Sequence, residues 1–120
     1  QLQGGVAQGI GAALYEEVVY NDEGQNVTAS LVDYIIPTAT EIPPIEVVHI
    51  EAASLTTLGG FRGMGEGGTI GAPAAVANAV ADAVAPLGID ILELPVSPER
   101  LFRLIENSKQ HKDATHGHET

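Results

Sequence analysis

The sequence predicts an α+β fold in which a small sheet is packed with about three helices. Apolar residues recur at helical spacing in three stretches, and residues 45–52 form an extended apolar stretch. Between two shorter apolar stretches, Asn21-Asp22-Glu23-Gly24 is a strong turn signal. With 120 residues, 44% of them hydrophobic, the chain suits a single domain with a modest core.

The first predicted helix covers residues 4–17. Its apolar residues at helical spacing are Val6, Ile10, Ala13 and Leu14. Gly5 and Gly9 lie one turn apart, although glycine costs about 1 kcal/mol relative to alanine inside a helix. We therefore expect these two glycines to permit the close approach of another backbone. Two glutamates at the C-terminal end oppose the helix macrodipole, so the helix is expected to stop there.

Strands are predicted in the middle of the chain and once near its end. Residues 17–20 and 25–29 would form a hairpin around the turn, and residues 45–52 give the strongest strand pattern. Residues 89–94 are predicted as a short final strand. The stretch 30–36 is open to two interpretations, a short helical turn or an extended segment that ends at Pro37.

Two further helices follow. One is predicted from Pro73 to Ala85, with proline in the first turn that it favours. Ser97-Pro98-Glu99 then combines a capping hydroxyl, a first-turn proline and an acid, and predicts a helix to about Asn107. Residues 1–107 would thus form the folded unit, and the polar residues 108–120 are predicted as a disordered tail. That tail holds His111, His116 and His118, whose loose spacing favours the tail over a metal site.

Composition excludes several classes of function. Sixteen acidic residues against five basic ones give a formal charge of −11, which disfavours binding to nucleic acids and to anionic membranes. No apolar run approaches the roughly 20 residues that span a bilayer. The absence of cysteine excludes a disulfide or a thiolate metal site formed by this chain alone, and fits a cytoplasmic location.

The glycine-rich stretch from Phe61 to Pro73 is the candidate functional loop. It carries one carboxylate, Glu66, among glycines that let a ligand approach the main chain closely. Four interpretations compete: a structural turn, a dinucleotide-binding loop matching Gly63-x-Gly65-x-x-Gly68, a general base at Glu66, and a non-catalytic packing module. The dinucleotide pattern is weak, because no strand runs directly into the glycines and Glu66 would face the phosphates.

Five blocks of sequence, in order, match the pattern of one known family. The blocks are Gln1-Leu2-Gln3-Gly4-Gly5-Val6-Ala7-Gln8-Gly9-Ile10-Gly11, Leu14-Tyr15-Glu16-Glu17, Asp33-Tyr34 with Ile36-Pro37-Thr38, Gly63-Met64-Gly65-Glu66, and Leu94-Pro95-Val96-Ser97-Pro98-Glu99-Arg100. Together they resemble the large subunit of the molybdenum hydroxylases, the family of xanthine dehydrogenase, aldehyde oxidase and carbon monoxide dehydrogenase. The resemblance runs from Gln1 to about Ile105 and implies the C-terminal part of a molybdopterin-binding domain. It departs from the family pattern at Gly67-Gly68, where proline or serine is common.

The resemblance also implies roles for individual residues. Glu66 matches the catalytic glutamate that activates a molybdenum-bound hydroxyl for substrate hydroxylation, Gly63 and Gly65 would lie against the cofactor, and Gln1 matches a glutamine that reaches the pterin. The implied cofactor is molybdopterin with molybdenum, often as the cytosine dinucleotide. The implied partners are the remainder of the large subunit and iron–sulfur and flavin subunits or domains, in an oligomer. We expect the isolated chain to be inactive; the alternative is a stand-alone binding or assembly module that derives from this fold.

Overall fold

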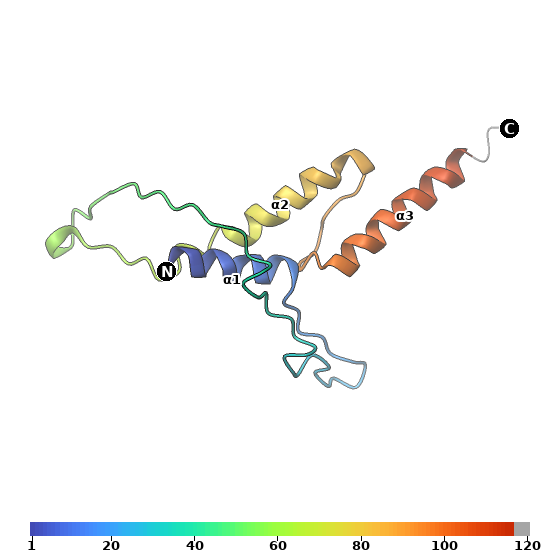
Figure 1. Cartoon of the computed structure of the whole chain (residues 1–120), viewed down its shortest axis with the longest axis horizontal. Coiled ribbons are helices and arrows are strands. Elements are labelled where there is room, and N and C mark those ends of the chain that lie inside the picture. The colour runs from blue at the N-terminus through green and yellow to red at the C-terminus, as the bar shows by residue number, and fades with distance from the viewer. Residues whose placement is uncertain (117–120) are drawn as a thin grey trace.

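The computed structural model describes residues 1–116, with side chains for residues 1–110, and it is helical. The elements, in order, are α1 (Leu2–Leu14), the 3-10 turn η1 (Leu58–Gly60), α2 (Ala72–Val84), the 3-10 turn η2 (Ala85–Leu87) and α3 (Pro98–His116). Two irregular segments connect α1 to α2: residues 15–57, which lead to η1, and residues 61–71, which follow it (Figure 1).

The predicted sheet is wrong: residues 1–116 contain three α-helices and no β-strand. At the predicted hairpin only one isolated bridge forms, between Tyr20 and Asn26. The ladder stops there because side chains take the next positions: the Val19 N–H donates to Thr28 Oγ1 at 3.0 Å, and the Thr28 N–H donates to Asn26 Oδ1 at 2.9 Å. The turn itself forms, with the Gly24 N–H donating to the Asn21 carbonyl at 2.9 Å.

The other two predicted strands are irregular for a different reason. Residues 45–52 are extended, but none of their backbone groups takes part in a backbone–backbone hydrogen bond among the described residues. Residues 89–94 likewise have no neighbouring strand in the described part of the chain. A strand requires a partner, and the described chain offers none to either segment.

The three predicted helices form, with shifted ends. In α1 the N–H groups of Tyr15 and Glu16 both donate to the Gly11 carbonyl at 2.9 Å, which closes the helix earlier than predicted. The last helix, α3, continues past Asn107 to His116 because no glycine or proline interrupts it before Gly117. Part of the segment predicted to be a disordered tail is therefore helical. Residues 117–120 lie outside the described part of the chain, and the three tail histidines lie outside the described side chains.

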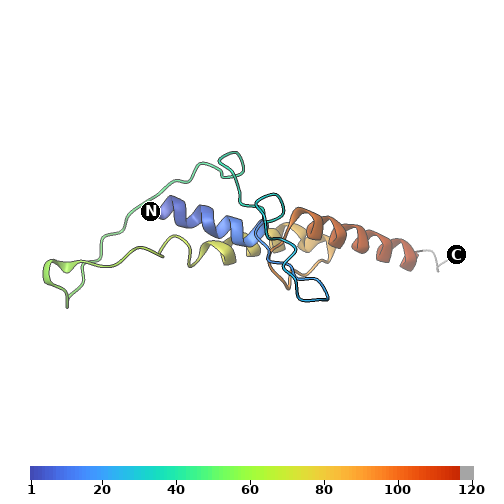
Figure 2. The same ribbon diagram turned by 90° about the horizontal axis from the view of Figure 1, so that it is seen from below.

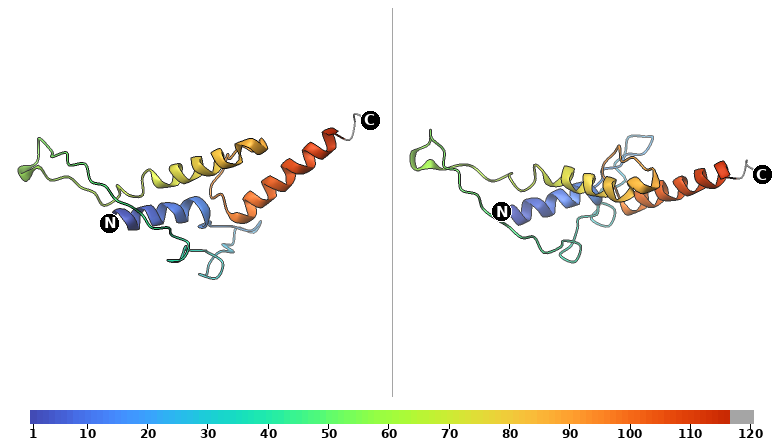
Figure 3. Two further views of the ribbon diagram at one scale, coloured as in Figure 1. Left: turned by 45° about the horizontal axis from the view of Figure 1, so that its top comes forward. Right: turned by 90° about the horizontal axis from the view of Figure 1, so that it is seen from above.

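Helices α1 and α2 lie side by side, and α3 extends away from the end of α1 (Figures 2 and 3). A backbone hydrogen bond of 2.7 Å from the Val96 N–H to the Ala13 carbonyl connects the end of α1 to the segment just before α3. Arg100 strengthens it, because its guanidinium donates to the Pro95 carbonyl at 2.8 Å and to Glu17 Oε1 at 3.0 Å. The small core sits here, with Ala13, Val84, Ile89 and Val96 buried.

The molecule is much more extended than a compact domain. Its radius of gyration is 19.8 Å, whereas a compact chain of this length would have about 14 Å. Large apolar side chains are correspondingly exposed, including Ile50 at 93% and Leu55 at 100%. None of the helices in the described residues combines the length and the apolar composition needed to cross a membrane.

Candidate active site

The glycine-rich loop leads directly into α2. Its centre is a tight turn in which the Glu66 carbonyl accepts hydrogen bonds from the N–H groups of Thr69 and Ile70, at 3.0 and 3.3 Å. Pro73 lies in the first turn of α2, as predicted, and fixes where the loop becomes helical. The main chain of Glu66 is therefore held from its C-terminal side by a turn that α2 anchors.

Helix α1 holds the same loop through its glycine face. A Cβ added to Gly5 would lie 2.9 Å from Gly68 Cα and 3.0 Å from Thr69 N, and one added to Gly68 would lie 2.5 Å from the Leu2 carbonyl oxygen. A Cβ added to Gly9 would collide with Ala72 Cβ. The predicted close approach of another backbone is thus present at Gly5, and it places the first turn of α1 against the Glu66 turn. Gly9 instead packs against the side chains of Ala72 and Pro73.

Gln1 makes the only described side-chain hydrogen bond to residues 63–65. Its Nε2 donates to the Gly65 carbonyl at 2.6 Å, across 64 positions of sequence. The structure therefore brings Gln1, Gly65 and the backbone of Glu66 together. A Cβ at Gly63 or Gly65 would meet nothing within 4 Å, so the main chain there borders open space.

The Glu66 side chain is exposed, and its carboxylate has no hydrogen bond or ion pair with any described side chain. Arg62, its nearest cation in the sequence, points elsewhere: its Nη2 donates to the Ala53 carbonyl at 3.3 Å. That contact closes the base of the η1 loop, in which the Ser54 N–H also donates to the Gly60 carbonyl at 3.0 Å. Glu66 is thus available to a group that does not belong to the described residues.

Two other carboxylates are engaged away from this loop. The Tyr34 hydroxyl donates to Glu16 Oε2 at 2.6 Å, and this hydrogen bond raises the pKa of Tyr34 above its ordinary value. Hydrogen bonds from the Thr38 hydroxyl and N–H to the Glu41 carboxylate lower the pKa of Glu41. These pairs fold residues 30–41 onto themselves and onto the end of α1.

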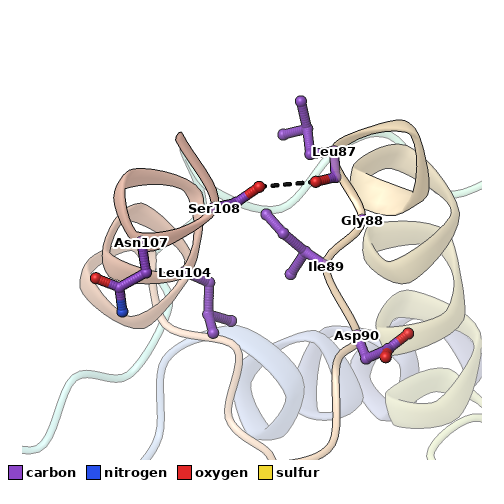
Figure 4. A pocket seen from close by; sticks show the side chains of 7 residues that line it. All are labelled: Leu87, Gly88, Ile89, Asp90, Leu104, Asn107 and Ser108. Carbon is purple, nitrogen blue, oxygen red and sulfur yellow. Dashed lines mark hydrogen bonds between the residues drawn. The ribbon is translucent and has the colours of Figure 1, made fainter. Parts of the chain in front are cut away.

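A pocket of about 450 Å³ lies between α3 and the segment formed by the end of η2 and the residues that follow it (Figure 4). Ser108 Oγ donates to the Leu87 carbonyl at 2.7 Å across it, and Ile89 and Leu104 line it from opposite elements. None of the predicted site residues contributes to its lining.

Comparisons with known proteins bear on this geometry. Residues 1–43 match the family described as the molybdopterin cofactor-binding domain. Over 103 residues the chain is 50% identical to the nicotine 6-hydroxylase large subunit of Paenarthrobacter nicotinovorans, a match that covers 86% of this chain and 13% of that protein. It is 35% identical to the xanthine dehydrogenase molybdenum-binding subunit of Escherichia coli O157:H7, a match that covers 85% of this chain and 13% of that protein. The chain belongs to the molybdenum hydroxylase large-subunit family.

Solved structures of the family share the arrangement described above. Quinoline 2-oxidoreductase from Pseudomonas putida 86 superposes with a TM-score of 0.84 at 50% identity, over 88% of this chain and 13% of that one. Carbon monoxide dehydrogenase from Oligotropha carboxidovorans superposes with a TM-score of 0.85 at 30% identity, over 92% of this chain and 14% of that one. The chain thus spans about an eighth of the length of these relatives. Its open shape is the shape of the matching segment inside much larger chains.

The described residues fit the molybdopterin cofactor of this family. The N–H groups of residues 63–65 donate to no acceptor in the described part of the chain, and no Cβ covers Gly63 or Gly65. Main-chain donors free of side chains, next to the amide of Gln1, are the groups that bind phosphates and polar ring edges. The groups that fit the cofactor are these donors, and the Glu66 carboxylate is not one of them.

Reasoning from sequence missed two features of this site. It did not connect Gln1 to Gly65, because a contact over that separation leaves no local pattern. It found the close-approach glycines in α1 from their spacing but did not identify Gly68 as the partner. Of Gly67-Gly68, the departure from the family pattern, Gly68 has a local reason, because it lies against the backbone of α1. Gly67 has none, because a Cβ there would meet only the flexible side chain of Met64.

Proposed function

We propose that this chain, within a complete large subunit, forms one wall of a molybdopterin site and supplies Glu66 as the general base of a hydroxylation reaction. One observation supports it above the others: the only carboxylate on the glycine loop is exposed and without a described partner, beside bare main chain that Gln1 joins to α1.

Other walls must come from outside the described residues. The chain covers about an eighth of its relatives, and its exposed apolar side chains need cover. The remainder of the large subunit is the proposed source of that cover. Iron–sulfur and flavin subunits or domains, in an oligomeric enzyme, are the proposed route for electrons. A location in the cytoplasm remains a prediction.

In the proposed reaction, Gly63, Gly65 and Gln1 bind and orient the cofactor through main-chain N–H groups and a side-chain amide. The molybdenum cofactor, when bound, would supply the centre that takes up the two electrons together with the hydrogen that leaves the attacked substrate carbon. A carboxylate oxygen of Glu66 accepts the proton of the water or hydroxyl whose oxygen attacks the substrate carbon. General-base catalysis of this kind contributes typically 10²–10⁴-fold.

The proposed substrate class is a nitrogen-containing aromatic ring. Its support is the 50% identity to a nicotine 6-hydroxylase subunit and to quinoline 2-oxidoreductase, against 30% to carbon monoxide dehydrogenase. Such rings have electron-poor carbons next to nitrogen, and these carbons accept an attacking oxygen. Nicotine and quinoline are the probes that test this class in the assembled enzyme.

The decisive variant is Glu66→Gln, which keeps the size of the side chain but cannot accept the proton. We expect turnover per bound molybdenum to fall by about 10²–10⁴-fold while molybdenum content stays at the parent level. The control is Glu51→Gln, which makes the same change at another exposed glutamate with no described hydrogen bond and should leave turnover unchanged. Turnover of Glu66→Gln within a few-fold of the parent would refute the role of Glu66 and favour a non-catalytic module.

A further inference from the structure

Two glutamines in the first turn of α1 reach out to different loops. Gln1 Nε2 donates to the Gly65 carbonyl at 2.6 Å, and Gln3 Nε2 donates to the Ile45 carbonyl at 3.1 Å. We propose that Gln1 is a positioning residue for Glu66, which it fixes through the Gly65 carbonyl, in addition to any contact with the cofactor. This inference rests on the proposed function of Glu66.

The covalent geometry of the loop carries the argument. The Gly65 carbonyl and the Glu66 N–H belong to one planar peptide group, so a bond that fixes the carbonyl also fixes the direction in which the chain enters Glu66. On the other side, the Glu66 carbonyl is fixed by the N–H groups of Thr69 and Ile70. The main chain of Glu66 is therefore held at both peptide groups, and Gln1 supplies the whole of one side.

No other described group makes a hydrogen bond that could fix the Gly65–Glu66 peptide group in place of Gln1. Gly63 and Gly65 have the widest backbone freedom of any residue type, and both border open space. The N–H groups of residues 63–65 have no acceptor among the described groups. Without Gln1, the chain that leads into Glu66 would be free to rotate, and the turn that begins at the Glu66 carbonyl would lose the contact that fixes its N-terminal side.

The chemistry of the amide suits this role. Gln1 uses one N–H on Gly65 and keeps its other N–H and its Oε1 for a second contact. A glutamate of the same shape cannot donate, and its carboxylate would repel the Gly65 carbonyl. A negative charge at the N-terminus of α1 is itself favourable to the helix, so Gln1→Glu changes the contact without weakening α1.

The experiment compares Gln1→Glu with Gln3→Glu in the assembled enzyme. The first readout is hydrogen exchange of Thr69 and Ile70, the amides that report the Glu66 turn, in enzyme prepared without cofactor. We expect faster exchange there in Gln1→Glu only. Gln3→Glu, the matched control, removes a donor from a different loop and should leave exchange at Thr69 and Ile70 unchanged. The second readout, with quinoline or nicotine, is turnover per bound molybdenum, expected to fall about 10- to 100-fold with KM little changed.

Each outcome decides between roles. Unchanged exchange at Thr69 and Ile70 overturns the proposal, and if molybdenum is lost as well, Gln1 serves the cofactor alone. Should Gln1→Glu not fold, Gln1→Ala removes the same donor without adding charge, and the same comparison applies. Glu66→Gln, measured in parallel, separates the two hypotheses: full turnover there refutes the base, whereas unchanged exchange in the Gln1 variants refutes only the positioning role.

Discussion

The contact between α1 and the Glu66 turn can be tested with one methyl group. In Gly5→Ala the new Cβ would lie 2.9 Å from Gly68 Cα, 3.0 Å from the Gly68 carbonyl carbon and 3.0 Å from Thr69 N. All three are backbone atoms, so no side chain can rotate away, and either α1 or the turn must shift. Gly4→Ala is the matched control, because a Cβ there meets nothing within 4 Å.

The expected magnitudes follow from these contacts. Replacing glycine by alanine inside a helix gains about 1 kcal/mol at either position. Forcing an extra methyl group into a packed contact costs about 1–3 kcal/mol. Gly4→Ala should therefore stabilise α1, and Gly5→Ala should be less stable than Gly4→Ala by about 1–3 kcal/mol.

Hydrogen exchange in the assembled enzyme measures this difference, since it reports local free energies of opening even where global unfolding is not two-state. The amides to compare are those of α1 and of Thr69 and Ile70. Faster exchange of the Glu66 turn in Gly5→Ala, with slower exchange of α1 in Gly4→Ala, is the predicted result. Equal stabilisation by both substitutions would refute the close contact between α1 and Gly68.

Two further predictions concern the C-terminal end of α1. The pKa of Tyr34 is raised above 10.0 by its hydrogen bond to Glu16, so the stability advantage of the parent over Tyr34→Phe should be full below pH 10.0 and lost as the pH rises through the folded-state pKa. Ultraviolet difference titration of the two proteins checks this, and titration of Tyr34 at its ordinary pKa would contradict it. Glu17→Gln should destabilise the contact with Arg100 by no more than about 1 kcal/mol, and by less in high salt, because the ion pair is partly exposed. Melting temperatures of the parent and the variant at two salt concentrations test this. A larger loss of stability that does not depend on salt would count against it.

Local signals predicted the helices well. Pro73 and the sequence Ser97-Pro98 mark helix starts by properties of single residues, and the structure begins α2 and α3 within a residue or two of them. The predicted C-terminal end of α3 is too early because polar composition after Asn107 favours disorder, whereas no glycine or proline interrupts the helix before Gly117.

The sheet could not be judged from this sequence. Residues 45–52 have the composition of a strand, but a strand exists only with a partner, and the pattern in one segment says nothing about whether a partner is present. The same limit applies to the site. The loop glycines and Glu66 are visible in the sequence, whereas the contacts of Gln1 with Gly65 and of Gly5 with Gly68 depend on the packing of α1 against the loop.

The rate of enzyme reduction by substrate in a single anaerobic turnover, measured per bound molybdenum near neutral pH, tests the central claim most directly. It observes the chemical step without product release or electron transfer to an acceptor. If Glu66 is the base, reduction of Glu66→Gln near neutral pH is about 10²–10⁴-fold slower than that of the parent. A Glu66→Gln rate that matches the parent would contradict the assignment of Glu66.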